Sequence, residues 1–479
     1  MFETAIAQLR FGYSMMTGRP FHLGSLEAII DAMLETQREF GAVGADGAEL
    51  IGGPTLDDDT RHDMQLRRFR AQALRAARET DYYGQLFREL DLDLDHLSHD
   101  DIARIPPTPK RAVRDDPSAF VRRSANVAFR TTTTGTTGKP TSTFFSQREM
   151  RTTVALNAMT FLLRAQITPA DIVQVSTSSR ATLGNNCFTR ACERIGAVWY
   201  QAGLVAPDHA LGLLAERHRI PGKVPQASYL NTYASYLGQL VECGLANGYG
   251  PSDFGLRTIS VGGEVVTQGL LARARELFGE VEYTQGFGMT ETWPFGGACC
   301  DQGHLHFEAP HGLLEVLSLE TSAPALHGEL GTMVATPFPP FRDASVVLRY
   351  DTQDVVRPVE PPLTCNMSRV PASSDIEGKL RLTVRHDDGL TTPRQVLEAL
   401  EALACVPLPA RCGFWADDGG VAVEVITRDD SRETRQAIGD SLEARGVPLR
   451  SLFVRTDRDE LEHPYPLRGD LREVMFARS

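Results

Sequence analysis

Residues 131–140 read Thr131-Thr132-Thr133-Thr134-Gly135-Thr136-Thr137-Gly138-Lys139-Pro140. The two glycines let the backbone approach phosphate oxygens, and the hydroxyls and amides offer many hydrogen-bond donors. Lys139 adds a point charge. Pro140 follows this lysine, whereas the other common phosphate loop continues with Ser or Thr into a helix. We therefore predict a loop that binds nucleotide phosphates, and the alternative interpretation is a polar surface loop.

The composition is that of an ordinary globular chain with an acidic balance. Its 479 residues carry a formal net charge of -13, which argues against non-specific nucleic-acid binding, because phosphate contacts need clustered Lys and Arg. No apolar run reaches the roughly 18 to 20 residues that a membrane helix needs. The start of the chain, Met1 to Thr4, lacks the basic and apolar parts of a signal peptide. We expect a cytoplasmic protein with reduced cysteines and no membrane segment.

The pattern of apolar residues changes twice along the chain. Residues 1–100 are predicted as a helical N-terminal extension of the large domain. In residues 101–370 short apolar runs alternate with amphipathic helices, which predicts a large α/β domain that contains the phosphate loop, with a small β-rich part near 313–336. Residues 371–479 are predicted as a small α+β domain. The expected elements include helices at 26–40, 64–83, 393–403 and 431–445 and strands at 380–384, 420–426 and 452–455.

Three further segments follow the loop in chain order. They are Gly262-Gly263-Glu264, Phe287-Gly288-Met289-Thr290-Glu291 and Arg349-Tyr350-Asp351-Thr352-Gln353-Asp354. Together with the loop, they resemble the motifs of the adenylate-forming (ANL) superfamily, which includes acyl- and aryl-CoA synthetases, peptide-synthetase adenylation domains and luciferases. Gln353 replaces the glycine of the family motif. The stretches 82–87 and 105–110 resemble the phenylacetate-CoA ligase-like branch, and the resemblance covers about residues 65 to 370.

The resemblance implies an adenylate-forming enzyme fold of the α/β class, with a large N-terminal domain, a β-rich subdomain and a small α+β C-terminal lid. It implies ATP and Mg²⁺ as cofactors, Thr290 as a contact of the α-phosphate and Glu291 as a Mg²⁺ ligand. Asp354 is a ribose candidate on chemistry alone, because a carboxylate accepts two charge-assisted hydrogen bonds from a vicinal diol. Lys139 is a further catalytic candidate. The other residues expected around the nucleotide are Thr132, Thr133, Thr134, Gly135, Thr136, Thr137, Gly138, Gly263, Glu264, Gly286, Phe287, Gly288, Met289 and Arg357.

Some members of that branch hold a structural zinc ion through a Cys, a His seven residues later and two later cysteines. Cys299 and His306 have this spacing, and Cys365 lies where the later pair is expected, but Met367 replaces its second cysteine. Closed zinc sites normally have four ligands, and three are evident here. Candidates for the missing ligand are Cys300, His304 and His311. The alternative interpretation is that these residues are buried or incidental.

The C-terminal part departs from the family pattern. The family ending resembles Gly-Lys-x-x-Arg, and its lysine neutralises charge between the carboxylate and the α-phosphate during adenylation. This chain reads Pro466-Leu467-Arg468-Gly469-Asp470 there, and no lysine follows Lys379. Of the family's Gly-Arg-x-Asp hinge, only Asp375 remains. Either Arg468 does the work of the lysine, or the chemistry differs from acyl-CoA synthesis, or the lid is degenerate and the protein only binds nucleotide.

The expected activity is ATP-dependent adenylation of an aromatic carboxylic acid with release of pyrophosphate. Thioester or amide formation could follow, and the acceptor is left open among CoA, a carrier protein, an amine and water. One alternative is an ATP-dependent diazotase that activates nitrite towards an aromatic amine, and another is a non-catalytic nucleotide-binding protein. By analogy with the branch, we expect a homodimer. Substrate contacts are expected from Arg180, Asn185, Asn186 and Tyr229.

Overall fold

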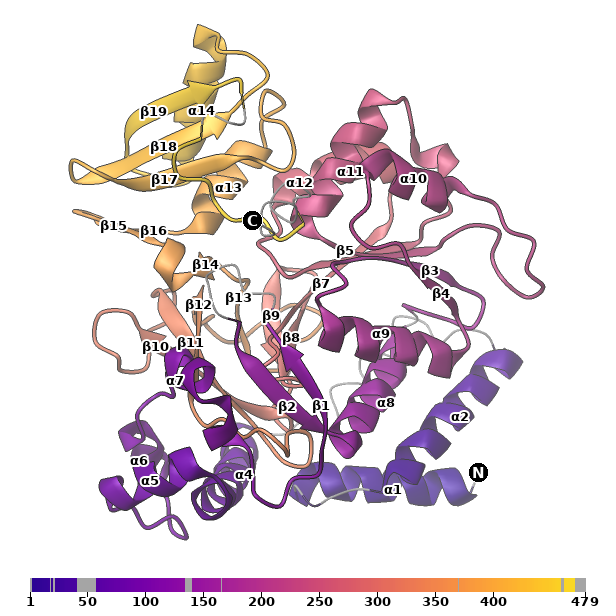
Figure 1. The fold of residues 1–479 in the computed structure, drawn as a ribbon, viewed down its shortest axis with the longest axis vertical. Helices are drawn as coiled ribbons and strands as arrows, with labels where there is room; N and C mark the ends of the chain where they lie inside the picture. The colour runs from indigo at the N-terminus through magenta and orange to yellow at the C-terminus, as the bar shows by residue number, and fades with distance from the viewer. Residues whose placement is uncertain are drawn as a thin grey trace. The chain divides into compact units, whose positions relative to one another are not determined.

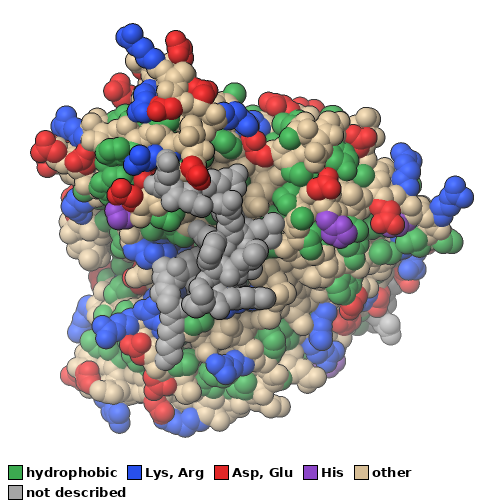
Figure 2. All heavy atoms as spheres, turned by 45° about the horizontal axis from the view of Figure 1, so that its top comes forward, with side chains coloured by type: hydrophobic (Ala, Val, Ile, Leu, Met, Phe, Trp, Pro, Cys, Tyr) green, Lys and Arg blue, Asp and Glu red, His purple; other side chains and the backbone are tan. Residues whose placement is uncertain are grey.

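The computed structural model describes residues 2–17, 19, 22–40, 57–133, 140–164, 166–368, 370–457 and 461–469. The chain forms two compact units, whose elements are labelled in Figure 1. The first comprises residues 1–169, 180–198 and 286–375, and the second comprises 170–179, 199–285 and 376–479. Among the described residues, no helix combines the length and the apolarity needed to cross a membrane. On the face drawn in Figure 2, basic side chains lie among acidic ones.

Helices make up most of the start of the first unit. They are α1 (Phe2–Thr17), α2 (Leu23–Phe40), α4 (Asp58–Glu79), α5 (Asp81–Leu90), α6 (His99–Arg104) and α7 (Lys110–Asp115). The single helix predicted at 64–83 is wrong, because Thr80 separates α4 from α5. The Thr80 hydroxyl donates to Ala76 O at 2.8 Å and accepts a hydrogen bond from Tyr83 N, so it ends one helix and caps the next.

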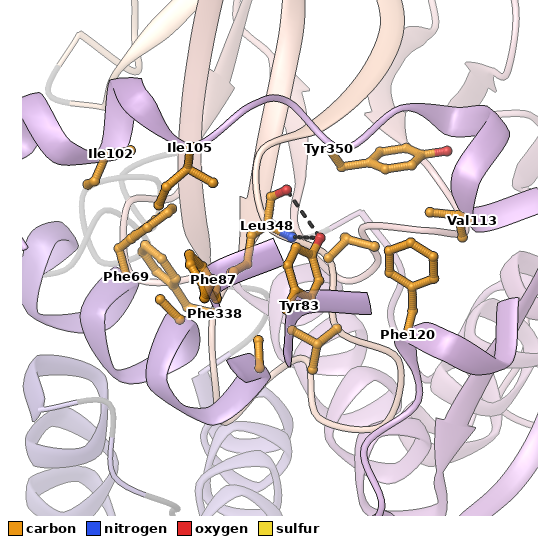
Figure 3. Close-up of a cluster of buried hydrophobic side chains, with 14 of the residues drawn as sticks. Phe69, Tyr83, Phe87, Ile102, Ile105, Val113, Phe120, Phe338, Leu348 and Tyr350 are labelled. Atoms are coloured by element: carbon orange, nitrogen blue, oxygen red, sulfur yellow. Dashed lines mark hydrogen bonds between the residues drawn. The ribbon is translucent and has the colours of Figure 1, made fainter. Parts of the chain in front are cut away.

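An aromatic core joins α4, α5, α6 and α7 to β12 (Tyr350–Val356). The side chains drawn in Figure 3 include Phe69, Phe87, Phe120 and Phe338. Tyr83 is fully buried among them, and its hydroxyl lies 2.7 Å from Leu348 N and 2.7 Å from Thr108 Oγ1. Thr108 also forms a parallel bridge with Tyr350. The residue two places before Lys110 is therefore tied to the start of β12.

The strands of the first unit form one hairpin and two antiparallel groups. The hairpin is β1 (Val127–Thr132) with β2 (Ser142–Ser146). One group contains β10 (Gly312–Ser318), β11 (Gly331–Pro337) and β12, which matches the predicted β-rich part. The other group contains β8 (Gly296–Cys299), β9 (His304–Phe307), β13 (Ala372–Ser374) and the end of β7 (Glu282–Gly288). Two further α-helices of the described residues in this unit are α8 (Gln147–Leu163) and α9 (Thr182–Ile195).

A buried ion pair supports the start of α8. Glu149 closes a capping box with Ser146. Its Oε1 also accepts hydrogen bonds from the backbone N–H groups of Asp343 at 2.6 Å and Ala344 at 3.0 Å, and it lies 3.2 Å from Arg342 Nη1. The side chains of Glu149 and Arg342 are 1% and 0% exposed. One carboxylate thus joins α8 to the chain at 342–344.

The second unit contains the parallel strands β3 (Ile172–Ser176), β5 (Tyr229–Tyr233) and β6 (Thr258–Gly262), in which β5 pairs with both neighbours. Its other elements up to residue 285 are β4 (Val198–Gln201), α10 (Pro207–Ala215), α11 (Ala234–Ala246), α12 (Gln268–Phe278) and the start of β7. This alternation of strands and helices confirms the predicted α/β pattern.

The C-terminal part of the second unit is built on a three-stranded sheet. Its strands are β17 (Cys412–Asp417), β18 (Gly420–Ile426) and β19 (Leu449–Arg455), and its helices are α13 (Pro393–Glu401) and α14 (Arg432–Ala444). The strand predicted at 380–384 is wrong: Leu380–Leu382 is a 3₁₀ turn, and β15 covers Val384–His386. α13 is joined to the start of α12, because Thr267 Oγ1 donates to Glu401 Oε2 at 2.5 Å.

Candidate active site

The β1–β2 hairpin carries the predicted phosphate loop. Thr131 and Thr132 end β1 and pair with β2. Thr133 closes the base of the loop, because its N–H donates to Thr141 O at 2.9 Å and its hydroxyl accepts from Thr141 N at 3.1 Å. The hairpin therefore brings the two ends of the loop together. Thr134, Gly135, Thr136, Thr137, Gly138 and Lys139 lie outside the described residues.

Glu291 is the best-defined charged group of the predicted site. Its side chain is 1% exposed, and its Oε1 lies 3.2 Å from Lys110 Nζ and accepts a hydrogen bond from the Tyr350 hydroxyl at 2.9 Å. Its Oε2 is buried and has no hydrogen-bond partner among the described residues. Burial acts to raise the pKa of Glu291, but the charge of Lys110 and hydrogen bonds to the carboxylate outweigh it and lower the pKa. The carboxylate is therefore held ionised with one oxygen available.

This arrangement fits a divalent cation. Mg²⁺ is usually bound through one or two carboxylates, with waters and substrate phosphates as its other ligands. The unpartnered Oε2 of Glu291 is a ligand of that kind. Lys110 was not among the predicted site residues, although it ends the stretch 105–110 that the sequence singled out.

The segment before Glu291 divides its side chains between the core and the surface. Met289 is buried and Phe287 is partly buried, and both pack in the aromatic core of the first unit. These contacts anchor the segment to the core of the first unit. Gly286 and Gly288 are exposed, and Thr290 is half-buried. A Cβ on Gly288 would lie 2.5 Å from the Trp293 ring, so the close approach requires glycine.

The predicted ribose residue Asp354 lies in β12 and is 4% exposed. Gln353, just before it, has φ of 59°, in the left-handed region that favours glycine, and the register between β11 and β12 shifts here. The backbone conformation thus suits the glycine of the family motif although the residue is glutamine. Arg349 holds Glu315 with two hydrogen bonds of 3.0 and 2.9 Å, which is a structural role. Arg357 donates from Nη1 to Gly328 O at 2.7 Å.

The predicted substrate residues are distributed over both units. In the first unit, Asn185 and Asn186 are half-buried in α9, and Arg180 is exposed just before it. Thr182 Oγ1 at the start of α9 lies 2.8 Å from Thr131 Oγ1, so this helix starts beside the phosphate hairpin. In the second unit, Tyr229 of β5 is 1% exposed, which is typical of a core residue rather than of a substrate contact.

The Gly-Gly-Glu turn of the second unit contacts the C-terminal segment. Gly263 has φ of 79°. Glu264 Oε2 accepts hydrogen bonds from Ser235 N at 2.9 Å and Ser235 Oγ at 2.7 Å, and Glu264 Oε1 accepts one from the N–H of Arg468. Both oxygens of Glu264, a predicted nucleotide contact, are thus engaged by protein groups. Asp470 lies outside the described residues.

A Cys/His cluster lies in the first unit, around β8 and β9. Ligand atoms of Cys300, His304, His306 and Cys365 all lie within 4.8 Å of one another. Cys299, one of the predicted ligands, is not in the group. Cys299 is the last residue of β8, and successive side chains of an extended chain point to opposite sides, so Cys300 takes its place.

The residue types and the hydrogen bonding of the cluster fit a zinc site. His306 Nδ1 lies 2.8 Å from Val370 O, which leaves its Nε2, 3.3 Å from Cys365 Sγ, as the lone-pair side. Histidines that bind metals usually hold their second nitrogen in this way. Two cysteines and two histidines form a complete ligand set for a closed tetrahedral zinc site.

Solved structures resemble the chain, whereas no protein-family model and no curated protein sequence matches it. A 2-hydroxyisobutyryl-CoA ligase in the postadenylation state with 2-HIB-AMP is 17% identical, covers 88% of this chain and 92% of its own, and has a TM-score of 0.72. A benzoate CoA ligase from Burkholderia xenovorans LB400 is 15% identical, covers 75% of this chain and 70% of its own, and has a TM-score of 0.53. This chain has the adenylate-forming fold.

The adenylate-forming fold confirms the predicted fold class. The similar ligases share its mixed α/β architecture, with a large N-terminal domain and a smaller C-terminal one. ATP-bound MatB from Rhodopseudomonas palustris also resembles the chain, with 17% identity, 71% of this chain and 66% of its own covered, and a TM-score of 0.52. The motifs of residues 131–140, 287–291 and 349–354 thus lie in a chain with the fold that they predicted.

Proposed function

We propose that the chain is an AMP-forming ligase that activates a carboxylic acid with ATP. The observation that carries this proposal is the Glu291 carboxylate, which Lys110 keeps ionised and whose second oxygen has no partner among the described residues. It lies where the sequence motif predicts a Mg²⁺ ligand. The fold supports the proposal, because similar structures include a CoA ligase with 2-HIB-AMP, a benzoate CoA ligase and an ATP-bound MatB chimera.

In the proposed reaction, a carboxylate oxygen of the substrate attacks the α-phosphorus of ATP in line with the departing pyrophosphate. The new bond joins the acid to AMP, and the bond from the α-phosphorus to the bridging oxygen breaks. Glu291 would hold Mg²⁺ through Oε2, and bound Mg²⁺ screens the charge of the polyphosphate. Thr290 would contact the α-phosphate and Asp354 the ribose. Arg468 would supply the positive charge that the family's lysine supplies.

The proposed substrate is an aromatic carboxylic acid, as the resemblance to the phenylacetate-CoA ligase-like branch implies. One similar structure is a benzoate ligase and another a 2-hydroxyisobutyryl ligase, so an aryl acid and a short hydroxy acid both belong in the test. CoA is the first acceptor to try, because both of these enzymes are CoA ligases. A cytoplasmic homodimer and transfer to a carrier protein stay predictions.

A second candidate function is that of an ATP-dependent diazotase, which activates nitrite towards an aromatic amine. One observation favours it: Asp470 follows Gly469 where the family ending resembles Gly-Lys, so the lysine-assisted step has no direct equivalent at this position. Nitrite is small and would need less of the lid than an acyl-CoA synthesis does.

Pyrophosphate release from Mg-ATP distinguishes these functions. Purified protein is incubated with benzoate, phenylacetate, aminobenzoates or 2-hydroxyisobutyrate, each with and without CoA and with and without nitrite. Release with an acid alone, and faster turnover with CoA, supports the ligase. Release that requires nitrite overturns acid activation in favour of the diazotase. Binding of ATP without any release would mean that the protein only binds nucleotide.

We also propose that Cys300, His304, His306 and Cys365 hold a structural zinc ion. Elemental analysis should find one zinc per chain, and Cys365→Ser should lower both the zinc content and the thermal midpoint. Cys299→Ser changes the neighbouring cysteine, which lies outside the cluster, and should retain the zinc. A purified protein that is stably folded and free of zinc after growth in zinc-supplemented medium would contradict the proposal.

A further inference from the structure

Three side chains of the second unit form a clamp on the C-terminal segment: Ser235, Gln239 and Glu264. Glu264 bridges two parts of the chain, because its Oε2 accepts from the N–H and hydroxyl of Ser235 and its Oε1 accepts from the N–H of Arg468. Ser235 Oγ also accepts from Gly469 N at 2.9 Å. Gln239 Nε2 donates to Gly469 O at 2.9 Å. The clamp therefore holds both backbone polar groups of Gly469 and the N–H of Arg468.

The clamp holds the backbone and leaves the Arg468 side chain exposed. The guanidinium makes no hydrogen bond or ion pair with any of the described residues. Its position beside the Gly-Gly-Glu turn follows from Gly263, where an added Cβ would lie 3.5 Å from Arg468 Nη1 and 3.0 Å from the Tyr233 ring. Gly469 is buried, and a Cβ there would lie 2.8 Å from Ser235 Oγ. Only glycine fits the clamp at this position.

We infer that Glu264 is a positioning residue, which fixes the backbone at Arg468 so that the guanidinium is presented beside Gly263 for the adenylation step. This inference rests on the proposed function, in which Arg468 supplies the cation. Both oxygens of Glu264 already accept hydrogen bonds from protein groups, which favours positioning over direct contact with the nucleotide. A long, flexible arginine gains most from such anchoring, because a cation stabilises a transition state only when it is held in place.

Hydrogen–deuterium exchange of the full-length protein tests whether the clamp exists, without any ligand. Glu264→Gln replaces an acceptor oxygen by an amide donor, and Ser235→Ala removes the hydroxyl that joins Glu264 to Gly469. Both should speed amide deuteration at residues 468 and 469 about tenfold or more, because the Arg468 N–H donates to the Glu264 carboxylate and the Gly469 N–H to the Ser235 hydroxyl that this carboxylate holds. Glu276→Gln, on the exposed side of α12, is the control and should change the deuteration rate at residues 468 and 469 by less than about twofold. Unchanged deuteration in the Glu264 variant overturns the clamp.

A double-mutant cycle tests whether the clamp acts through Arg468. The readout is ATP–pyrophosphate isotope exchange with the acid that supports pyrophosphate release best. Glu264→Gln should lower kcat about tenfold with the KM for ATP within about twofold. In an Arg468→Ala background, Glu264→Gln should lower kcat by less than about twofold. A full tenfold loss there, or a rise in KM alone, overturns the positioning role.

Failure of the proposed function and failure of the positioning role of Glu264 give different results. If the wild-type protein supports isotope exchange with none of the acids, the proposed function fails and the catalytic role of the clamp fails with it. Amide deuteration still decides whether Glu264 holds the segment. If the wild type is active and both Glu264→Gln and Ser235→Ala keep its kcat, the proposed function stands and the inference fails.

Discussion

Lys110 Nζ lies 3.2 Å from Glu291 Oε1, and the lysine side chain is 23% exposed whereas the carboxylate is 1% exposed. The lysine begins α7, and the two residues before it bring the chain alongside β12 through the bridge between Thr108 and Tyr350. Tyr350 donates to the same oxygen of Glu291. The ionisation of the proposed Mg²⁺ ligand therefore depends on a lysine that is distant in the sequence.

Replacing Lys110 by Met should raise the pKa of Glu291. Burial raises this pKa, and the positive charge of Lys110, which lowers it, would be lost. Protonated Glu291 would not hold Mg²⁺, so activity should fail at a higher pH than in the wild type. We expect the acidic limb of the kcat/KM profile to move up by about one pH unit or more. Arg111→Met, at an 84% exposed neighbour in α7, is the matched control. Superimposable acidic limbs for the two variants would contradict this prediction.

Replacing Tyr83 by Phe should destabilise the protein by about 1 to 3 kcal/mol, because the buried N–H of Leu348 loses its hydrogen bond to the hydroxyl. Urea unfolding measures the loss. Tyr82→Phe is the control, since the Tyr82 hydroxyl has no hydrogen bond to any described residue, and it should change the stability by less than about 0.5 kcal/mol. Equal stabilities of the two variants would show that the hydrogen bonds drawn in Figure 3 contribute nothing.

At Gln353, the left-handed φ of 59° predicts an order of stability among variants. Gln353→Gly relieves the strain of a side chain in this region and should be at least as stable as the wild type, by up to about 1 kcal/mol. Gln353→Val places a β-branched residue there and should lose about 1 to 2 kcal/mol. The midpoints of urea unfolding give the order. A valine variant as stable as the glycine variant would rule out this conformation.

The raised pKa of the buried Glu401 side chain predicts that the protein loses stability as the pH rises. Burial raises the pKa of Glu401 to about 7, against an ordinary value of 4.5. Between these two values the folded state binds a proton that the unfolded state lacks, so stability present below pH 4.5 is lost by pH 7. The loss of stability is on the order of 3 kcal/mol. Glu401→Gln places an uncharged side chain at this position at every pH. The free energy of unfolding of this variant should therefore depend less on pH, and at pH 8 it should exceed that of the wild type.

Urea unfolding of the wild type and of Glu401→Gln at pH 5 and pH 8 measures this difference. The Thr267 hydroxyl donates to Glu401 Oε2 and Ala410 N donates to Oε1. The amide oxygen of the variant can accept from Ala410 N, and its nitrogen can donate to the Thr267 hydroxyl, which also has acceptor lone pairs. Glu276→Gln, at an exposed site, is the control for the loss of one charge. If the difference between the wild type and the Glu401 variant is the same at both pH values, the raised pKa is excluded.

The apolar patterns predicted the α/β class and several elements, and the resemblance of the motifs predicted the adenylate-forming fold. β18 spans Gly420–Ile426, the range expected from its apolar run, and α13 and α14 lie within two residues of their predicted ends. The strand predicted from the apolar residues between Leu380 and Val384 failed because so short a run is compatible with a 3₁₀ turn as well. Thr80 divided a helix because its hydroxyl can end one helix and cap another, which periodicity does not show.

The geometry of the site depended on contacts that spacing does not show. Choosing Cys300 over Cys299 requires knowing which face of β8 and β9 each side chain takes. The pairing of Lys110 with Glu291 requires α7 to be fixed to β12, which long-range hydrogen bonds accomplish. The engagement of Glu264 by the C-terminal segment likewise joins residues that are far apart in the chain. The motifs identified the chemical groups but not these partners.

The pair formed by Glu149 and Arg342 constrains how this chain can diverge. Loss of either residue alone would leave a buried charge without its partner, at a cost of about 3 to 5 kcal/mol, whereas an apolar pair of similar volume could be tolerated. Glu149 also holds the amides of Asp343 and Ala344, so a substitution there would disturb two segments at once. Descendants of a common ancestor should therefore keep both positions or exchange them together, and covariation between them would mark lineages in which this helix cap was rebuilt.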